Sequence, residues 1–276
     1  MINNKPRALI FGCGHFGKSI LDKVKEEYNV IGYLDTYETG DYNGIKLYSP
    51  TKINDFDYEI IIVATMMSMN TVLEQLQNIG VQREKINTDY VVVQTKARIL
   101  FMEKLGNLFY DRKIEGCVAE GGVFEGDFAK EINRVFSNRK LYLFDTFKGF
   151  DASDVVKDIE NDYSDSKINH LCANEKIVMS KLKYPEMCTI RKGHFPNTAN
   201  GINEEFCFVN LDFDLYQPTF SGLEYFYPRM VSGGVILIHD YFSEKYKGVK
   251  KAVNDWMKKM SFQIVHFWYL SETELV

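Results

Sequence analysis

The sequence lacks the features of a disulfide-rich, zinc-bound or membrane-spanning protein. Its five cysteines (Cys13, Cys117, Cys172, Cys188 and Cys207) are odd in number, scattered, and include no Cys-x-x-Cys pair. This pattern argues against a disulfide framework or a structural zinc site and favours a reducing cytosol. No run approaches the roughly 18 apolar residues that span a membrane, and the first residues are polar and form no signal segment. We therefore expect a cytoplasmic protein that does not associate with membranes.

Strong charge of either sign is also missing. The chain carries 33 Lys and Arg against 38 Asp and Glu, a formal net charge of -5 that is spread along its length. Such a balance gives no basic surface for nucleic acid, so we expect no nucleic-acid partner. With 276 residues, 45% of them hydrophobic, the chain is long enough for two globular domains.

Strand-like runs alternate with helical patterns along the whole chain, which predicts an α/β protein with two doubly wound parallel sheets. The first domain, residues 1–92, opens with a strand at 8–11, a glycine loop at 12–17 and a helix at 18–28. It closes with a short strand near 91–93. The two halves share this architecture but no sequence period, so no internal repeat is predicted.

The second domain, residues 93–276, includes a connecting helix at 96–112. It repeats the opening of strand, glycine loop and helix. Its predicted strands lie at 117–120, 141–145, 188–191, 206–212, 233–240 and 263–269. The tail after Phe262 looks short for a closing antiparallel pair of strands.

Polar residues stand at the ends of the second domain's strands, one strand after another. They are Glu120, Asp145, Gly193-His194, Asp212 and His239-Asp240. In a parallel sheet, ligands bind at the carboxyl ends of the strands, where the strand order reverses. A random distribution of charge would not favour that edge, so the pattern predicts a ligand site there.

Glu120 begins a loop that contains Gly121, Gly122 and Gly126. These glycines allow a tight turn and a close approach of the backbone to a ligand. An acid at this place disfavours a pyrophosphate and suits the cationic methionine end of S-adenosylmethionine. Asp145 is placed to accept hydrogen bonds from a ribose diol, and the alternative is that it caps a helix.

Asp212, His239 and Asp240 lie at the ends of neighbouring strands and offer three ligand atoms to a hard cation such as Mg²⁺. Bound metal would lower the pKa of a substrate hydroxyl and fix it for attack on a methyl sulfonium. Asp214 is near in sequence, although strand alternation points it elsewhere. The alternative is a set of solvated strand-end carboxylates.

The ordered motifs resemble the macrocin/mycinamicin type of sugar O-methyltransferase over roughly residues 97–260. The matching segments are 118–126 (VAEGGVFEG), 144–150 (FDTFKGF), 192–198 (KGHFPNT), 209–219 (VNLDFDLYQPT), Tyr227-Pro228, Gly233-Gly234 and 239–241 (HDY). The set in this order is far more specific than any one motif. The resemblance implies a class I methyltransferase (Rossmann-like) fold that uses S-adenosylmethionine and binds Mg²⁺ beside a sugar hydroxyl.

The resemblance also implies roles for individual residues. Cosubstrate contacts are expected from Glu120, Gly121, Gly122, Gly126, Asp145, Thr146 and Gly193. Metal ligands are expected at Asp212, His239 and Asp240, and catalytic roles at Asp212, His239 and His194. His239 stands where antibiotic-sugar members of the family often have Asp. The resemblance therefore does not imply a metal site made of three carboxylates. The general base stays open among His194, His239 and Asp214, and for each histidine a structural role is the alternative.

The first domain has Gly12-x-Gly14-x-x-Gly17 after a strand and Asp35 about twenty residues later, which is the setting of a dinucleotide fingerprint. It resembles the small Rossmann-like domains attached to bacterial nucleotide-sugar and polysaccharide-modifying enzymes. The resemblance implies that Gly12, Gly14, Gly17 and Asp35 bind a nucleotide or nucleotide-sugar. A purely structural role for this domain is the alternative.

The leading hypothesis is an S-adenosylmethionine- and Mg²⁺-dependent O-methyltransferase of glycan or natural-product biosynthesis. Its partner would be a small-molecule sugar or nucleotide-sugar acceptor, and we expect a homo-oligomer. One alternative is a nicotinamide-dependent oxidoreductase, suggested by the first domain, although the second lacks a Ser/Tyr-x-x-x-Lys type of catalytic set. The other is a non-catalytic nucleotide-sugar-binding protein that has lost its metal, suggested by His239.

Overall fold

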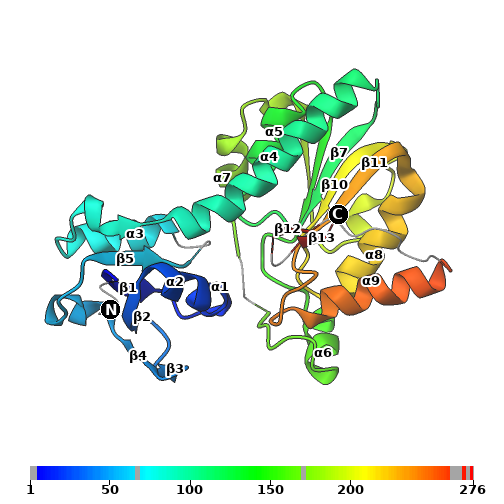
Figure 1. Cartoon of the computed structure of the whole chain (residues 1–276). Helices are drawn as coiled ribbons and strands as arrows, with labels where there is room; N and C mark the ends of the chain where they lie inside the picture. The colour runs from blue at the N-terminus through cyan, green and yellow to red at the C-terminus, as the bar shows by residue number, and fades with distance from the viewer. Residues whose placement is uncertain (1–4, 66–68, 169–171, 262–268, 272–273, 276) are drawn as a thin grey trace. The chain divides into compact units, whose positions relative to one another are not determined.

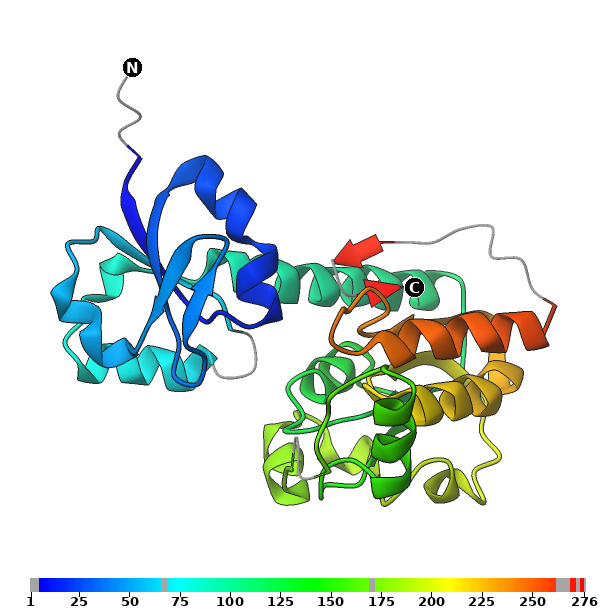
Figure 2. The ribbon, with the colours of Figure 1, turned by 90° about the horizontal axis from the view of Figure 1, so that it is seen from below.

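A computed structural model describes most of the chain. The described residues are 5–65, 69–168, 172–261, 269–271 and 274–275. They divide into two compact units, residues 1–96 and residues 97–276, each with its own sheet (Figure 1 and Figure 2). No helix within the described residues has the length and apolar character needed to cross a membrane.

The first unit is a six-stranded sheet in the order β3-β4-β2-β1-β5-β6. The strands are β1 (Arg7–Phe11), β2 (Asn29–Leu34), β3 (Gly40–Tyr42), β4 (Ile45–Tyr48), β5 (Ile60–Val63) and β6 (Ile86–Asn87). All neighbours are parallel except the antiparallel pair of β3 and β4. The helices are α1 (His15–Ser19), α2 (Leu21–Glu27) and α3 (Met69–Asn78). Alternate residues of β1 pack on opposite faces: Ala8 and Ile10 join the core that contains α2, and Leu9 and Phe11 join the core that contains α3.

Two predicted elements of this unit are wrong in detail. The predicted helix at 18–28 is two short helices, α1 and α2, which are separated at Ile20. The strand near 91–93 does not form, because these valines lie in α4 (Asp89–Asp111). Asn87 accepts a hydrogen bond from the Asp89 amide at 2.7 Å and so starts this helix. Helical context thus overrides the strand preference of valine.

The second unit is a seven-stranded sheet in the order β12-β13-β11-β10-β7-β8-β9. The strands are β7 (Cys117–Gly121), β8 (Leu141–Asp145), β9 (Cys188–Lys192), β10 (Phe206–Leu211), β11 (Met230–Ile238), β12 (Tyr269–Ser271) and β13 (Glu274–Leu275). Strands β7 to β11 are parallel, and β13 pairs antiparallel with β11 and with β12. The tail therefore does form the closing antiparallel pair. The predicted strand at 263–269 lies outside the described residues except for its last one.

Helices cover both faces of this sheet (Figure 1). They are α4, α5 (Ala129–Val135), α6 (Ala152–Glu160), α7 (Glu175–Lys181), α8 (Tyr216–Phe226) and α9 (Lys247–Lys259). One core joins α4, α5 and α7 to one face, and a second core joins α8 and α9 to the other. The buried runs of β7, β8 and β10 are explained by this double covering. Both units are thus Rossmann-like α/β domains, as predicted.

The chain reverses direction between β7 and β10. From β7 it proceeds outward to β8 and β9, and it then returns to place β10 and β11 on the other side. In doubly wound sheets, ligands bind at the carboxyl ends of the strands at such a switch point. This rule predicts a ligand site of the second unit at the ends of β7 and β10.

Candidate functional site

Backbone hydrogen bonds bring the ends of β7, β10 and β11 together. The Asp212 amide donates to the Gly121 carbonyl at 2.7 Å, and the His239 amide donates to the Leu211 carbonyl at 2.9 Å. The loop after β7 and the residues after β10 and β11 therefore lie beside one another at the switch point. The strand-end acids predicted from the sequence are assembled by this pairing.

Four side chains form what we call the acid cluster: Asp212, Asp214, His239 and Asp240. Each offers one ligand atom, and these atoms lie within 4.8 Å of one another. His239 Nδ1 is 2.9 Å from Asp212 Oδ1 and 2.7 Å from Asp240 Oδ2. Asp214 and Asp240 have left-handed backbone angles, φ 63° and 57°, which are uncommon for residues other than glycine. The geometry thus turns Asp214 into the cluster, which the sequence left open.

The acid cluster holds protons between its carboxylates. Burial acts to lower the pKa of His239, but Asp212 and Asp240 outweigh it and hold this pKa well above its ordinary value. Burial, then Asp240 and Asp212, raise the pKa of Asp214 well above its usual range. Burial opposes ionisation of Asp240, but His239 and a hydrogen bond from Asp214 bring its pKa below the ordinary value. Positive charge is therefore stabilised at this point, and carboxylate oxygens suit a hard cation.

Glu120 lies beside the acid cluster and is almost completely buried, with 2% of its surface exposed. Its Oε1 accepts a hydrogen bond from Asn210 Nδ2 at 2.9 Å, and its Oε2 has no hydrogen-bond partner among the described residues. Burial, and then Asp212, raise the pKa of Glu120 well above its usual range. A buried carboxyl with an unused oxygen fits a cationic hydrogen-bond donor.

Two further residues of the site were not predicted. Arg98 of α4 places Nη2 3.9 Å from Asp212 Oδ2, and its guanidinium lies 4.0 Å from the centre of the Phe128 ring. The helical pattern around Arg98 gives no sign of this, since its partner is far away in sequence. Asn210 could have been found, because it is a polar residue inside an otherwise apolar strand.

Asp145 holds the glycine loop that follows β7. Its Oδ2 accepts hydrogen bonds from the amides of Val123 at 2.7 Å and Phe124 at 2.9 Å, and its Oδ1 accepts one from the Phe147 amide at 2.6 Å. The helix-capping alternative is wrong, because the next helix is capped by Asp151. Each carboxylate oxygen can accept more than one hydrogen bond, so these bonds leave room for a ribose hydroxyl.

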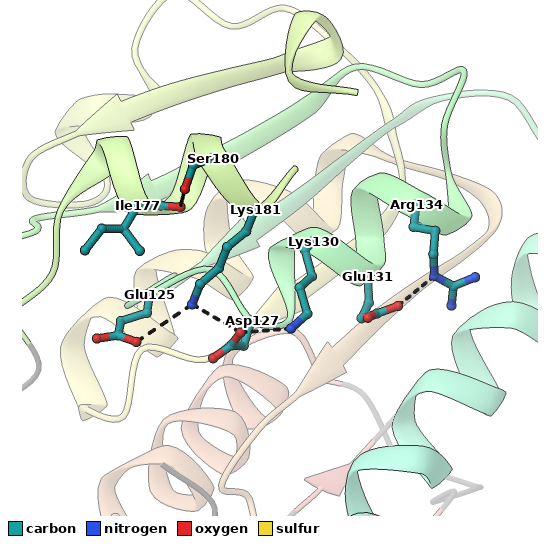
Figure 3. A network of polar contacts seen from close by, with 8 residues as sticks. All are labelled: Glu125, Asp127, Lys130, Glu131, Arg134, Ile177, Ser180 and Lys181. Atoms are coloured by element: carbon teal, nitrogen blue, oxygen red, sulfur yellow. Dashed lines mark hydrogen bonds and ion pairs between the residues drawn. The ribbon is translucent and has the colours of Figure 1, made fainter. Parts of the chain in front are cut away.

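The glycines of the loop allow it to pack closely against the residues that follow β10. A Cβ on Gly122 (φ 80°) would lie 1.9 Å from the Asp212 carbonyl oxygen, and one on Gly121 would lie 2.2 Å from the Phe213 ring. Gly126 and Gly193 also have positive φ, and Thr146 bonds within its own turn, to Gly149 and Lys148. Figure 3 shows how the far end of the loop is fixed to α7: Lys181 reaches Glu125 at 3.7 Å and Asp127 at 3.2 Å.

His194 belongs to a different group of side chains. Its Nε2 lies 2.7 Å from Asp154 Oδ2 of α6, and Asp151 completes this second group. The Gly193 amide donates to the Asp145 carbonyl at 2.9 Å, so the loop lies at the same edge of the sheet. The described structure does not bring His194 into the acid cluster with Asp212 and His239.

The first unit has its own glycine loop. Gly12 has φ 105°, and a Cβ on Gly17 would lie 1.9 Å from the Gly12 carbonyl oxygen, whereas one on Gly14 would meet nothing within 4 Å. Asp35 accepts hydrogen bonds from the amides of Cys13 at 2.7 Å, Tyr37 at 2.9 Å and Glu38 at 3.0 Å. Burial opposes ionisation of Asp35, but these bonds bring its pKa below the ordinary value. Asp35 thus holds its loop as Asp145 does in the second unit.

Comparisons with known proteins agree with this geometry. The family model "Macrocin-O-methyltransferase (TylF)" matches residues 61–264, and the model "C2185-like, N-terminal" matches residues 4–87. The O-methyltransferase NovP is similar in structure, with a TM-score of 0.53 and 18% identity, over 73% of this chain and 86% of that chain. CalS11, a calicheamicin methyltransferase, has a TM-score of 0.52 and 16% identity, over 76% and 85%. No curated protein matches the sequence.

The structural likenesses, at such low identity, support the fold alone. The macrocin-O-methyltransferase model is more informative, because it matches well over half of the 276 residues and includes Arg98, Glu120 and the acid cluster. Its range also contains the second sheet as far as β11. The chain therefore belongs to the macrocin-O-methyltransferase (TylF) family, and it is an S-adenosylmethionine-dependent O-methyltransferase.

Proposed function

We propose that this enzyme methylates a hydroxyl of a sugar or nucleotide-sugar with the help of Mg²⁺ or another divalent cation, in glycan or natural-product biosynthesis. The proposal is carried by one observation. Four side chains of metal-ligand type lie within 4.8 Å of one another beside the buried Glu120. Family membership favours this function over the nicotinamide-dependent oxidoreductase and the non-catalytic binding protein.

The residues around Glu120 fit S-adenosylmethionine. The unpaired Oε2 of Glu120 suits the ammonium of the methionine end, and Asp145 with the glycine loop suits the adenosine end. When bound, the cosubstrate supplies a methyl group on a sulfonium. The acceptor oxygen forms a bond to the methyl carbon while the sulfur–carbon bond breaks and leaves a neutral thioether. Glu120 and Asp145 would orient this methyl group toward the acid cluster.

The acid cluster fits a divalent cation, with Asp212, His239 and Asp240 as ligands and Asp214 within reach. A cation there would lower the pKa of an acceptor hydroxyl. His239 ligates only as a neutral imidazole, so its proton must leave before it binds metal. The proton of the acceptor hydroxyl passes to a side chain at the site. Asp214 and His239 are favoured as this general base over His194, because they lie in the acid cluster.

The test is methyl transfer to a panel of sugars and nucleotide-sugars, with and without EDTA. We expect EDTA to abolish transfer. We expect Asp212→Asn to lower kcat by roughly 100-fold or more while S-adenosylmethionine binding, measured by calorimetry, stays within about threefold. Asp162→Asn, whose side chain is 96% exposed, is the matched control. If the folded protein does not bind S-adenosylmethionine, the proposal is wrong. If methyl transfer continues in the presence of EDTA, the proposed dependence on a divalent cation is wrong.

For the first unit, we propose binding of a nucleotide or nucleotide-sugar. The open space beside Gly14 supports this, because a ligand phosphate can approach the backbone there. Gly14 has φ −67° and ψ −173°, which any residue can adopt. Gly14→Val should therefore fold normally yet block the approach. Calorimetry with UDP-sugars and NAD(H) should show binding to the wild type and none to the variant, and unchanged binding by Gly14→Val would contradict the assignment.

A further inference from the structure

Asn210 is a polar residue in the middle of the second sheet. Every residue of β10 is buried, and Asn210 has no exposed surface. It is paired in register with Glu120 of the neighbouring strand β7. Paired residues on adjacent strands point to the same face of the sheet. The hydrogen bond from Asn210 Nδ2 to Glu120 Oε1, at 2.9 Å, is the result of this register.

The pair leaves two buried oxygens unused. Glu120 Oε2 and Asn210 Oδ1 have less than 1 Å² of exposed surface and no hydrogen-bond partner within the described part of the chain. Buried acceptors in native structures are nearly always paired, so each unpaired one needs an explanation. With Glu120 ionised, reversing the Asn210 amide would not help, because its oxygen would then face Glu120 Oε1, which is also an acceptor. In that state the pair lacks a hydrogen-bond donor.

The charges around the pair select a cationic donor. The charged groups that act on Glu120 are Asp212, Arg98 and Asp145, two acids and one base. A carboxylate or phosphate would be repelled by this excess of acids. An ammonium group offers three N–H donors and a positive charge, and such an ammonium stands at the methionine end of S-adenosylmethionine.

We infer that Asn210 is a positioning residue for the methyl donor. Its amide holds Glu120 Oε1, so that Oε2 is fixed for the ammonium of the methionine end. Without this hold, the buried carboxyl could rotate, and the ammonium would lose its partner. The inference rests on the proposed role of Glu120 toward the cosubstrate, and it adds a residue that does not itself bear charge.

The test compares three ligands by calorimetry on the full-length protein. S-adenosylmethionine and S-adenosylhomocysteine carry the ammonium, and 5′-methylthioadenosine lacks it. Asn210→Leu keeps the side-chain shape. We expect it to weaken the binding of S-adenosylmethionine and S-adenosylhomocysteine by about 10- to 100-fold, the usual contribution of a hydrogen bond to a charged group. Binding of 5′-methylthioadenosine should change by less than about threefold. If the leucine variant does not fold, Asn210→Ser replaces it. Its side chain is too short to reach Glu120, so we expect the same selective loss of binding.

Two controls separate positioning from a general loss of packing. Asn133 is a buried amide whose side chain donates to the Tyr184 carbonyl at 2.9 Å and accepts from the Tyr184 amide at 2.7 Å. Asn133→Leu should lower the stability of the protein, and any change in binding affinity should be the same for all three ligands. The second control is a double-mutant cycle with Glu120→Gln. If Asn210 acts through Glu120, the double variant should bind S-adenosylmethionine no more weakly than Glu120→Gln alone.

The outcomes are distinct. Equal weakening of all three ligands by Asn210→Leu, or no weakening, overturns the inference while leaving the proposed function intact. Additive losses in the cycle overturn it as well, since Asn210 would then act independently of Glu120. If the wild type fails to bind S-adenosylmethionine at all, the proposed function fails first. Selective loss for the two ligands that carry the ammonium supports the inference.

Discussion

Asp35 and Asp145 occupy equivalent positions in the two sheets. Asp145 is the last residue of β8, and Asp35 directly follows β2. Each accepts a 2.7 Å hydrogen bond from a backbone amide 22 residues earlier, in the glycine loop after the first strand of its unit. An aspartate thus fixes the glycine loop in both units. Such a loop needs this support because glycines have no side chains that pack against the rest of the domain. A strand-end acid in such a sheet therefore has a structural task before any ligand binds.

At this scale we predict the effect of Asp145→Ala. Three backbone amides, those of Val123, Phe124 and Phe147, lose their acceptor. We expect the free energy of unfolding to fall by about 2–4 kcal/mol, because unpaired amides in partly buried surroundings are costly. Urea denaturation measures this, with the exposed Asp162→Asn as control. A variant as stable as the wild type that had lost S-adenosylmethionine binding would show that Asp145 serves the ligand alone.

Among the elements, α6 has an inverted pattern of burial. Asp154 and Asp158 face inward and are buried, whereas Val156 and Ile159 are 50% and 55% exposed. The two acids have partners from distant parts of the chain: His194 Nε2 at 2.7 Å and the Tyr216 amide, the first of α8, at 3.1 Å. Helix α6 is therefore docked through polar contacts.

Asp158 should make stability depend on pH. Burial raises its pKa from 3.8 to about 6, so the folded state keeps this proton over a range where the unfolded state has lost it. Stability from this group therefore falls as pH rises from about 4 to about 6 and then stays level. Asp158→Asn removes the effect. We expect the variant to gain about 1–3 kcal/mol relative to the wild type between pH 4 and pH 7.5.

Denaturation at pH 4, 5, 6 and 7.5 measures this difference. Asp162→Asn alters a carboxylate just beyond the same helix that is 96% exposed, and it should show no comparable trend. A difference between Asp158→Asn and the wild type that stayed constant over the whole range would mean that Asp158 titrates as it does in the unfolded chain.

At the scale of the whole molecule, the sequence predicted the parts that local patterns control. The strands β7, β8 and β10 are runs buried on both faces, and their polar ends meet because parallel strands end at one edge. Contacts between segments that are distant in the sequence could not be predicted from local patterns. Arg98 reaches Asp212, and Asp154 reaches His194, across 40 residues or more. The buried positions of α6 include Asp154 and Asp158 while Val156 and Ile159 are exposed, so the apolar pattern of its sequence does not indicate which face of the helix is buried.

The described residues of each unit form their own cores: two clusters of buried apolar side chains lie in the first unit and two in the second, and none of these contains residues of both. Units with their own cores can unfold separately, and a ligand stabilises the unit that binds it by mass action. At 100 times its dissociation constant, S-adenosylmethionine should add about 2.7 kcal/mol to the second unit. We expect calorimetry to show two transitions, of which this ligand raises only one.

Hydrogen exchange would assign that transition. Protection by S-adenosylmethionine should rise in β7, β8 and β10 and in the loop at 121–128, and a UDP-sugar should instead protect the loop at 12–17. The Gly14→Val variant is the control, because it should lose the second effect and keep the first. A single transition that moves as a whole with either ligand would show that the units unfold together, because a ligand bound to one would then stabilise both.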